Sequence, residues 1–133
     1  MATYLKYDHF IEAMWNKELD LFGTTDTVKA VIHTDLPVVA TDDELADLTE
    51  ITGTGYTAGG DDIQNDATRT GDTVTMTGVD VVWTASAADW TNTARYVTIH
   101  DSTAVTNILI AYWALATQQK EKTQNVTLVS VIC

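Results

Sequence analysis

The feature that most limits the possible folds of this chain is its abundance of threonine, which makes up 24 of the 133 residues. The Cβ-branched threonine side chain is stiff, so it suits the pleated surface of a β-strand, and its hydroxyl group tolerates solvent. In residues 72–78, Val74 and Met76 alternate with threonines, a pattern typical of a half-buried antiparallel strand. We therefore expect a mainly β protein.

Other segments extend this prediction along the chain. Residues 28–33, 79–83, 94–101 and 125–133 are each interpreted as strands between turn signals. Residues 108–116 are apolar on both sides, which predicts a central strand. One of its faces should lie on the core, and the other under an N-terminal helix or against another subunit. About six strands of this kind predict an antiparallel β-sandwich or a squashed barrel.

The N-terminal segment departs from the β pattern. Over residues 3–21, apolar side chains recur at the spacing of one helical face, which contains Tyr7, Phe10, Ile11, Met14 and Trp15. We predict one amphipathic helix that stops near Gly23 and packs on the core or docks a partner subunit. The chain is then divided into a helix or arm, residues 1–23, and a β-sandwich, residues 24–133, within a single domain overall.

A glycine-rich stretch, "GTGYTAGGDD" at residues 53–62, holds four of the seven glycines. A phosphate-binding loop would need a basic residue beside the glycines, whereas Asp61 and Asp62 follow here. The glycines are instead expected to permit positive φ angles in consecutive turns. Together with Asp66, the two aspartates could offer oxygen ligands to calcium, although the spacing is not that of an EF-hand loop. A solvated acidic loop is the favoured interpretation.

The formal charge of −12 restricts the possible partners. Seven basic residues leave no basic patch for nucleic acid or for an anionic membrane surface. No apolar run approaches the roughly 20 residues of a membrane span. Cys133, the one cysteine, cannot form an internal disulfide.

No constellation with catalytic or metal-binding spacing is present in the sequence. His9, His33 and His100 lie on separate predicted elements, and the serines lack a nucleophile-elbow context. We therefore predict a protein that is not an enzyme and that needs no cofactor or metal. A sugar-binding module is the alternative from another class, with Trp90 in a polar loop as its stacking platform.

Three stretches, in this order, resemble a family of small structural proteins of tailed bacteriophages. "FIEAMWNKELDLFGTTDTVKAVIHT" resembles the family's opening helix and strand, and "ELADLTEITGTGYTAGG" resembles its acidic turn and glycine loop. "VDVVWTASAADWTNTARYVTIHDSTAVTNILIAYWAL" resembles its next strand pair and its L-I-A-Y strand. The resemblance covers about residues 10 to 116. The last strand is less similar, and the longer insertion often found before L-I-A-Y is missing.

The resemblance implies a virion structural protein, most specifically a capsid decoration or cement protein on the capsid exterior. Its implied partner is the major capsid protein, whose shell it would bind from outside and stabilise. A tail or neck component is the alternative within the same family. We also expect a homodimer or homotrimer. The residues expected to contact a neighbouring subunit or the capsid are Phe10, Met14, Trp15, Tyr56, Leu109 and Trp113.

Overall fold

Ten strands and one α-helix make up the regular structure of the described residues, apart from one 3-10 turn. The computed structural model describes residues 4–22, 26–84, 94–119, 123–126 and 131–132. In chain order the elements are β1 (Leu5–Lys6), α1 (Asp8–Trp15), β2 (Val28–His33), η1 (Leu45–Asp47), β3 (Asp61–Asp62), β4 (Asp66–Thr70), β5 (Thr73–Thr77), β6 (Val81–Thr84), β7 (Ala94–Asp101), β8 (Leu109–Gln119), β9 (Thr123–Val126) and β10 (Val131–Ile132).

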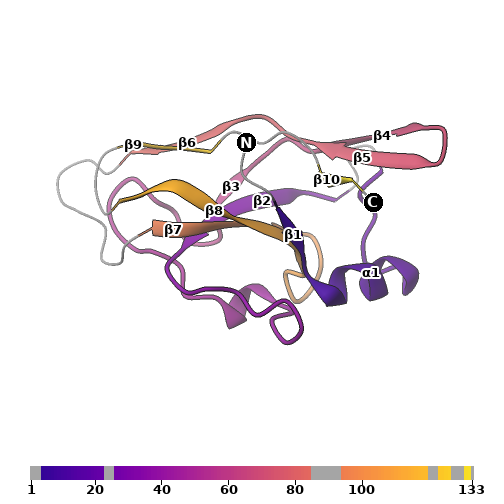
Figure 1. The fold of residues 1–133 in the computed structure, drawn as a ribbon, viewed down its shortest axis with the longest axis horizontal. Helices are drawn as coiled ribbons and strands as arrows, with labels where there is room; N and C mark the ends of the chain where they lie inside the picture. The colour runs from indigo at the N-terminus through magenta and orange to yellow at the C-terminus, as the bar shows by residue number, and fades with distance from the viewer. Residues whose placement is uncertain (1–3, 23–25, 85–93, 120–122, 127–130, 133) are drawn as a thin grey trace.

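The strands are antiparallel and form two layers. The larger sheet has five strands in the order β1-β8-β7-β2-β3. A three-stranded sheet, β10-β5-β4, and the pair β6-β9 lie over one of its faces, η1 lies on the opposite side, and α1 lies at one end of the molecule (Figure 1). The prediction of a mainly β, antiparallel fold with one helix is confirmed, and the layering is that of a sandwich.

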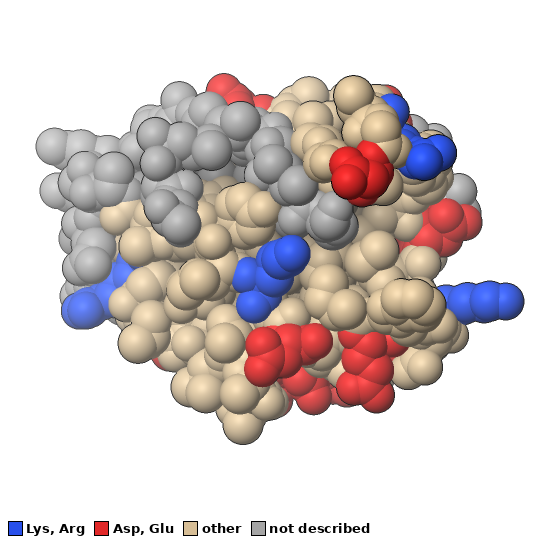
Figure 2. Space-filling view, turned by 45° about the vertical axis from the view of Figure 1, so that its right-hand side comes forward, with Lys and Arg blue, Asp and Glu red and all other residues tan. Residues whose placement is uncertain are grey.

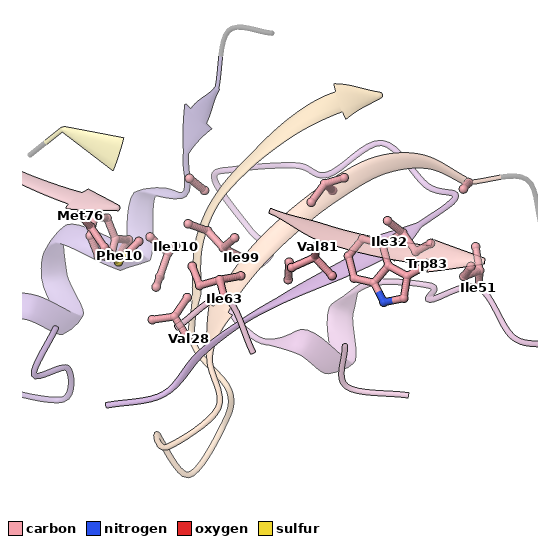
Figure 3. Packing of buried hydrophobic residues seen from close by; sticks show 14 residues of the cluster. Phe10, Val28, Ile32, Ile51, Ile63, Met76, Val81, Trp83, Ile99 and Ile110 are labelled. Atoms are coloured by element: carbon pink, nitrogen blue, oxygen red, sulfur yellow. The ribbon is translucent and has the colours of Figure 1, made fainter. Parts of the chain in front are cut away.

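The main core fills the space between the layers (Figure 3). The larger sheet contributes Ile32, Ile99 and Ile110, whose side chains alternate with residues facing the other way. The layer formed by β10-β5-β4 and β6-β9 contributes Met76 and Trp83, and α1 adds Phe10. Trp83 is among the largest fully buried side chains, so it fixes much of the spacing between the layers.

A second, smaller core covers the opposite face of the larger sheet. It contains Tyr7, Val31, Leu48, Leu109 and Tyr112. The described part of β8 is therefore buried on both faces around these positions, as the apolar run at residues 108–116 predicted. The second face is covered mainly by Tyr7 and by the segment around Leu48, and β8 lies next to the edge strand β1.

The helix is shorter than the sequence pattern predicted, because the sheet edge competes for the preceding backbone. Residues 5–6 pair with Tyr112 and Ala111 of β8, and the Tyr7 N–H donates to the Ile110 carbonyl at 3.1 Å. The helix starts only at Asp8 and ends at Trp15. Within the described residues, no helix is long and apolar enough to cross a membrane. The expected stop at Gly23 lies outside the described residues.

Strand β4 was not expected from the sequence. Its burial pattern explains why, since Ala67 is its one buried residue and no apolar alternation is visible. The strand pairs with β5 through a tight hairpin at Gly71, whose φ is 65°. The last predicted strand, residues 125–133, is also divided, because β9 pairs with β6 while β10 pairs with β5.

Candidate functional site

The α1 helix has one buried side and one exposed apolar side. Phe10 and Ala13 are fully buried against the sandwich. Ile11 is 40% exposed, Met14 is 39% exposed and Trp15 is 83% exposed. We call Ile11, Met14 and Trp15 the α1 surface. An isolated exposed apolar residue needs no explanation, but three on one helix face, including a tryptophan, mark a candidate contact site.

The surroundings of the α1 surface are acidic. Between Asp8 and Phe22 the chain carries four acidic residues and one lysine, and the acidic ones are all exposed. They are Asp8, Glu12, Glu18 and Asp20. Figure 2, which brings the α1 side of the molecule forward, shows no continuous basic patch on the face it displays. A partner at this site would therefore meet apolar side chains within a negative potential.

The start of α1 is tied to the sheet by main-chain and side-chain bonds. The Tyr7 N–H donates to the Ile110 carbonyl, and the Asp8 N–H donates to the Val39 carbonyl at 3.0 Å. The Tyr7 hydroxyl, buried on the lower face of the sheet, lies 2.9 Å from the Thr98 hydroxyl. These bonds hold the α1 surface in a fixed place on the sandwich.

Thr98 also contacts a buried histidine. Nε2 of His33 lies 2.8 Å from Thr98 Oγ1, and Nδ1 lies 3.0 Å from the Asp35 carbonyl and 3.3 Å from Asp35 Oδ1. Burial lowers the pKa of His33, and the neighbouring Asp35 opposes this effect. A hydroxyl, an imidazole and a carboxylate that contact one another in this order resemble the groups of a nucleophilic catalytic triad. Thr98 is 0% exposed, so an external substrate does not reach its hydroxyl in this conformation.

The glycine-rich loop is a structural element closed by Glu50. Its glycines have positive φ angles, as predicted, at Gly53, Gly55, Gly59 and Gly60. Glu50 Oε1 accepts hydrogen bonds from the Tyr56 hydroxyl at 2.6 Å and from the Gly59 N–H at 2.9 Å. The Tyr56 ring packs against Trp83, with ring centroids 5.9 Å apart. Tyr56 therefore points into the molecule.

Two of the acidic residues after this loop, Asp62 and Asp66, accept hydrogen bonds from nearby backbone N–H groups. Asp61 and Asp62 form β3 on the edge of the larger sheet, and Asp62 Oδ1 accepts the Gln64 N–H at 2.7 Å. Asp66 Oδ1 accepts the Ala67 N–H at 2.8 Å. Over the part of the chain that the structure describes, no three His, Cys, Asp or Glu side chains are grouped so that they could hold a metal ion.

A buried pair of carboxyl groups, Asp26 and Asp101, was not foreseen from the sequence. Asp101 is fully buried, and its Oδ1 accepts the Thr103 N–H at 2.8 Å. Burial, and then a hydrogen bond with Asp26, raise the pKa of Asp101 to about 6. Oδ2 of Asp101 has no donor partner among the described groups when both carboxyls are ionised, so a shared proton is the natural way to satisfy it. An aspartate at a strand end followed by serine and threonine is a turn signal, and that pattern alone could have indicated the Oδ1 contacts.

The six residues predicted as contacts do not all reach the surface. Phe10 and Leu109 are fully buried, and Tyr56 is half-buried with its hydroxyl turned toward Glu50. Trp113 is half-buried against the core, whereas Met14 and Trp15 are exposed. A contact through Phe10 or Leu109 would need the core to open, because neither side chain is accessible. Trp90, the suggested sugar-stacking residue, lies outside the described residues.

Comparison of the chain with protein-family models, curated protein sequences and solved structures finds no significant match.

Proposed function

We propose that the protein is a structural component of a virion, and most specifically a capsid decoration protein that attaches through the α1 surface. The sequence resemblance to small phage structural proteins supports the class of protein. The observation that carries the attachment site is Trp15, which is 83% exposed on a helix whose opposite side is fully buried. In this proposal the sandwich acts as a rigid carrier and has no catalytic activity.

A single tryptophan can supply much of the required binding free energy. Burying an aromatic side chain removes about 150–250 Å² from water, which corresponds to about 4–6 kcal/mol before the costs of association. Tryptophan is also among the residues that most often dominate protein interfaces. Because decoration places many copies on one shell, modest contacts at each site still stabilise the whole particle.

The charge around the α1 surface indicates the chemistry of the partner. Exposed Asp8, Glu12, Glu18 and Asp20 surround the apolar residues, so the complementary surface should be an apolar pocket bordered by lysine or arginine. Two copies of this chain, each with a charge of −12, would repel one another at this site. The major capsid protein is thus the proposed partner at α1, and self-association to a dimer or trimer would use another surface, such as that around Trp113.

The deciding experiment is the incorporation of the protein into purified virions of the phage that encodes it. Quantitative mass spectrometry gives its copy number relative to the major capsid protein. A ratio near one or one third supports decoration, a ratio of a few per cent indicates the tail or neck alternative, and absence from the virion contradicts the proposal. Trp15→Ser should lower incorporation at least tenfold. Val82→Ser is the matched control, because Val82 is 51% exposed on β6, in the other layer and at the opposite end of the molecule from α1 (Figure 1).

A further inference from the structure

We propose that Tyr7, Thr98, His33 and Asp35 form an acid-sensitive latch that holds the N-terminal segment, and with it the start of α1, on the five-stranded sheet. Tyr7 immediately precedes α1, Thr98 lies on β7, and His33 ends β2. The Tyr7 hydroxyl lies 2.9 Å from Thr98 Oγ1, which lies 2.8 Å from His33 Nε2. His33 Nδ1 lies 3.0 Å from the Asp35 carbonyl oxygen.

The chemistry of the partners determines where each hydrogen lies. A carbonyl oxygen can only accept, so His33 Nδ1 must carry a hydrogen and donate it to Asp35. In a neutral imidazole Nε2 is then an acceptor, and the Thr98 hydroxyl donates to it. The Thr98 oxygen in turn accepts from the Tyr7 hydroxyl. With neutral His33, all the hydrogen bonds of this row therefore point in one direction, from Tyr7 to Asp35.

Several ionisable groups influence the pKa values of the residues in this row of hydrogen bonds. Those that face His33 or Tyr7 are Asp35, Glu50, Asp42, Tyr96 and Tyr112. Burial lowers the pKa of His33, while the carboxylates of Asp35 and Glu50 raise it. Burial also raises the pKa of Tyr7, so its hydroxyl stays protonated and remains a donor. The row of hydrogen bonds is thus complete near neutral pH, and protonation of His33 is favoured only in acid.

A second proton on His33 reverses the bond between His33 and Thr98. The proton, taken from solvent, binds Nε2, which then donates to Thr98 Oγ1. The Thr98 hydrogen then loses Nε2 as its acceptor, and it is either left unpaired or turns to the Tyr7 oxygen and displaces the Tyr7 hydrogen, so one of these two buried hydroxyls is unsatisfied in either case. An unsatisfied buried hydroxyl is costly, and Tyr7 is 1% exposed. Proton uptake therefore favours movement of Tyr7 toward water and breakage of the bonds from Tyr7 N–H to Ile110 and from Asp8 N–H to Val39.

This latch does not depend on the proposed function, because it concerns the attachment of α1 to its own sheet. Release of Tyr7 would also free the start of α1, and with it the α1 surface that a partner contacts, because Asp8, the first residue of α1, directly follows Tyr7.

The test uses the full chain labelled with ¹⁵N and ¹³C. NMR at neutral pH should show His33 as the neutral tautomer with hydrogen on Nδ1. During acid titration, the hydrogen-exchange protection of the Tyr7 and Asp8 amides should fall about tenfold as His33 becomes protonated. Amides of the β2–β7 ladder, such as those between Ala30 and Ile99, serve as internal references and should stay protected. Hydrogen on Nε2 at neutral pH, or an equal loss at the ladder amides, would overturn the proposal.

Tyr7→Phe is the discriminating variant, because it keeps the buried ring and removes the hydroxyl through which Thr98 is bonded to residue 7. His33 should still titrate in this variant, but protection of the residue 7 and 8 amides should no longer fall with its protonation. His9→Gln is the control, since His9 lies on α1 outside the chain and should leave the acid response unchanged. An acid response that persists in Tyr7→Phe would contradict the latch.

Discussion

The Tyr56 hydroxyl donates a 2.6 Å hydrogen bond to Glu50 Oε1, and this bond closes the glycine-rich loop over the edge of the main core. Burial, and then the neighbouring carboxylate, raise the pKa of Tyr56 well above its usual value, so the phenol remains a donor. The same Glu50 oxygen accepts the Gly59 N–H. A loop with the glycine content of a phosphate-binding loop is thereby a closed structural unit with the Glu50 carboxylate at its centre.

Loss of this contact should destabilise the fold by a measurable amount. Tyr56→Phe removes one hydrogen bond to a charged acceptor and should lower the free energy of unfolding by about 1.5–3 kcal/mol in urea denaturation. Glu50→Gln keeps an acceptor oxygen and should cost about 1 kcal/mol, whereas Glu50→Ala leaves both donors unpaired and should cost more than either. If Glu50→Ala were as stable as wild type, Glu50 would not be what closes the loop.

Gly60 should tolerate no side chain, for a reason distinct from its φ of 79°. A Cβ at this position would lie 1.9 Å from the Ala30 carbonyl oxygen, because the loop enters β3 directly against β2. Gly59 has a similar φ of 90° and nothing within 4 Å of such a Cβ. Gly59→Ala should therefore cost only the backbone strain of about 1–2 kcal/mol, and Gly60→Ala should cost clearly more or prevent folding. Equal unfolding midpoints for the two variants would contradict this close approach.

The sequence predicts the parts of the fold that repeat a simple pattern. Residues 28–33 were expected as a strand and are β2, and residues 94–101 are β7. Alternation or apolar runs identify such strands because one or both faces are buried. The pattern gave no signal for β4, where Ala67 is the one buried residue, and gave a false one for residues 5–6, which pair with β8 instead of extending the helix.

The candidate site was predicted in part, for a related reason. The helical spacing placed Phe10 and Trp15 on one face, but spacing alone does not say which side of a helix meets the sheet. In the structure the short α1 buries Phe10 and exposes Trp15. The buried contacts of His33, Thr98 and Tyr7 join residues up to 91 positions apart, and the chain pattern carries no signal for such pairings.

The two aromatic residues of α1 should therefore behave in opposite ways when truncated. Phe10→Ala removes a fully buried side chain and should lower the free energy of unfolding by about 3–5 kcal/mol. Trp15→Ala changes an exposed side chain and should leave stability within about 0.5 kcal/mol of wild type. Thermal and urea unfolding monitored by circular dichroism measure both effects. A strongly destabilised Trp15→Ala variant would show that this side chain supports the fold, and would weaken the argument for the α1 surface.

Asp101 should make the protein less stable as the pH rises from about 4 to about 6. Its pKa lies near the ordinary aspartate value of 3.8 when the chain is unfolded and is raised to about 6 in the folded state by burial and by Asp26. Between these values the folded state binds more protons than the unfolded state, so stability falls with increasing pH and the loss is complete above about 6.

Asp101→Asn keeps the oxygen that accepts the Thr103 N–H and can donate to Asp26. This variant should be more stable than wild type at pH 7, and its stability should change less between pH 4 and 6 in urea denaturation. Asp72→Asn, at the exposed turn before β5, is the matched control and should retain the wild-type slope. A variant Asp101→Asn that is less stable at pH 7 and keeps that slope would show that Asp101 is ionised without cost in the folded protein.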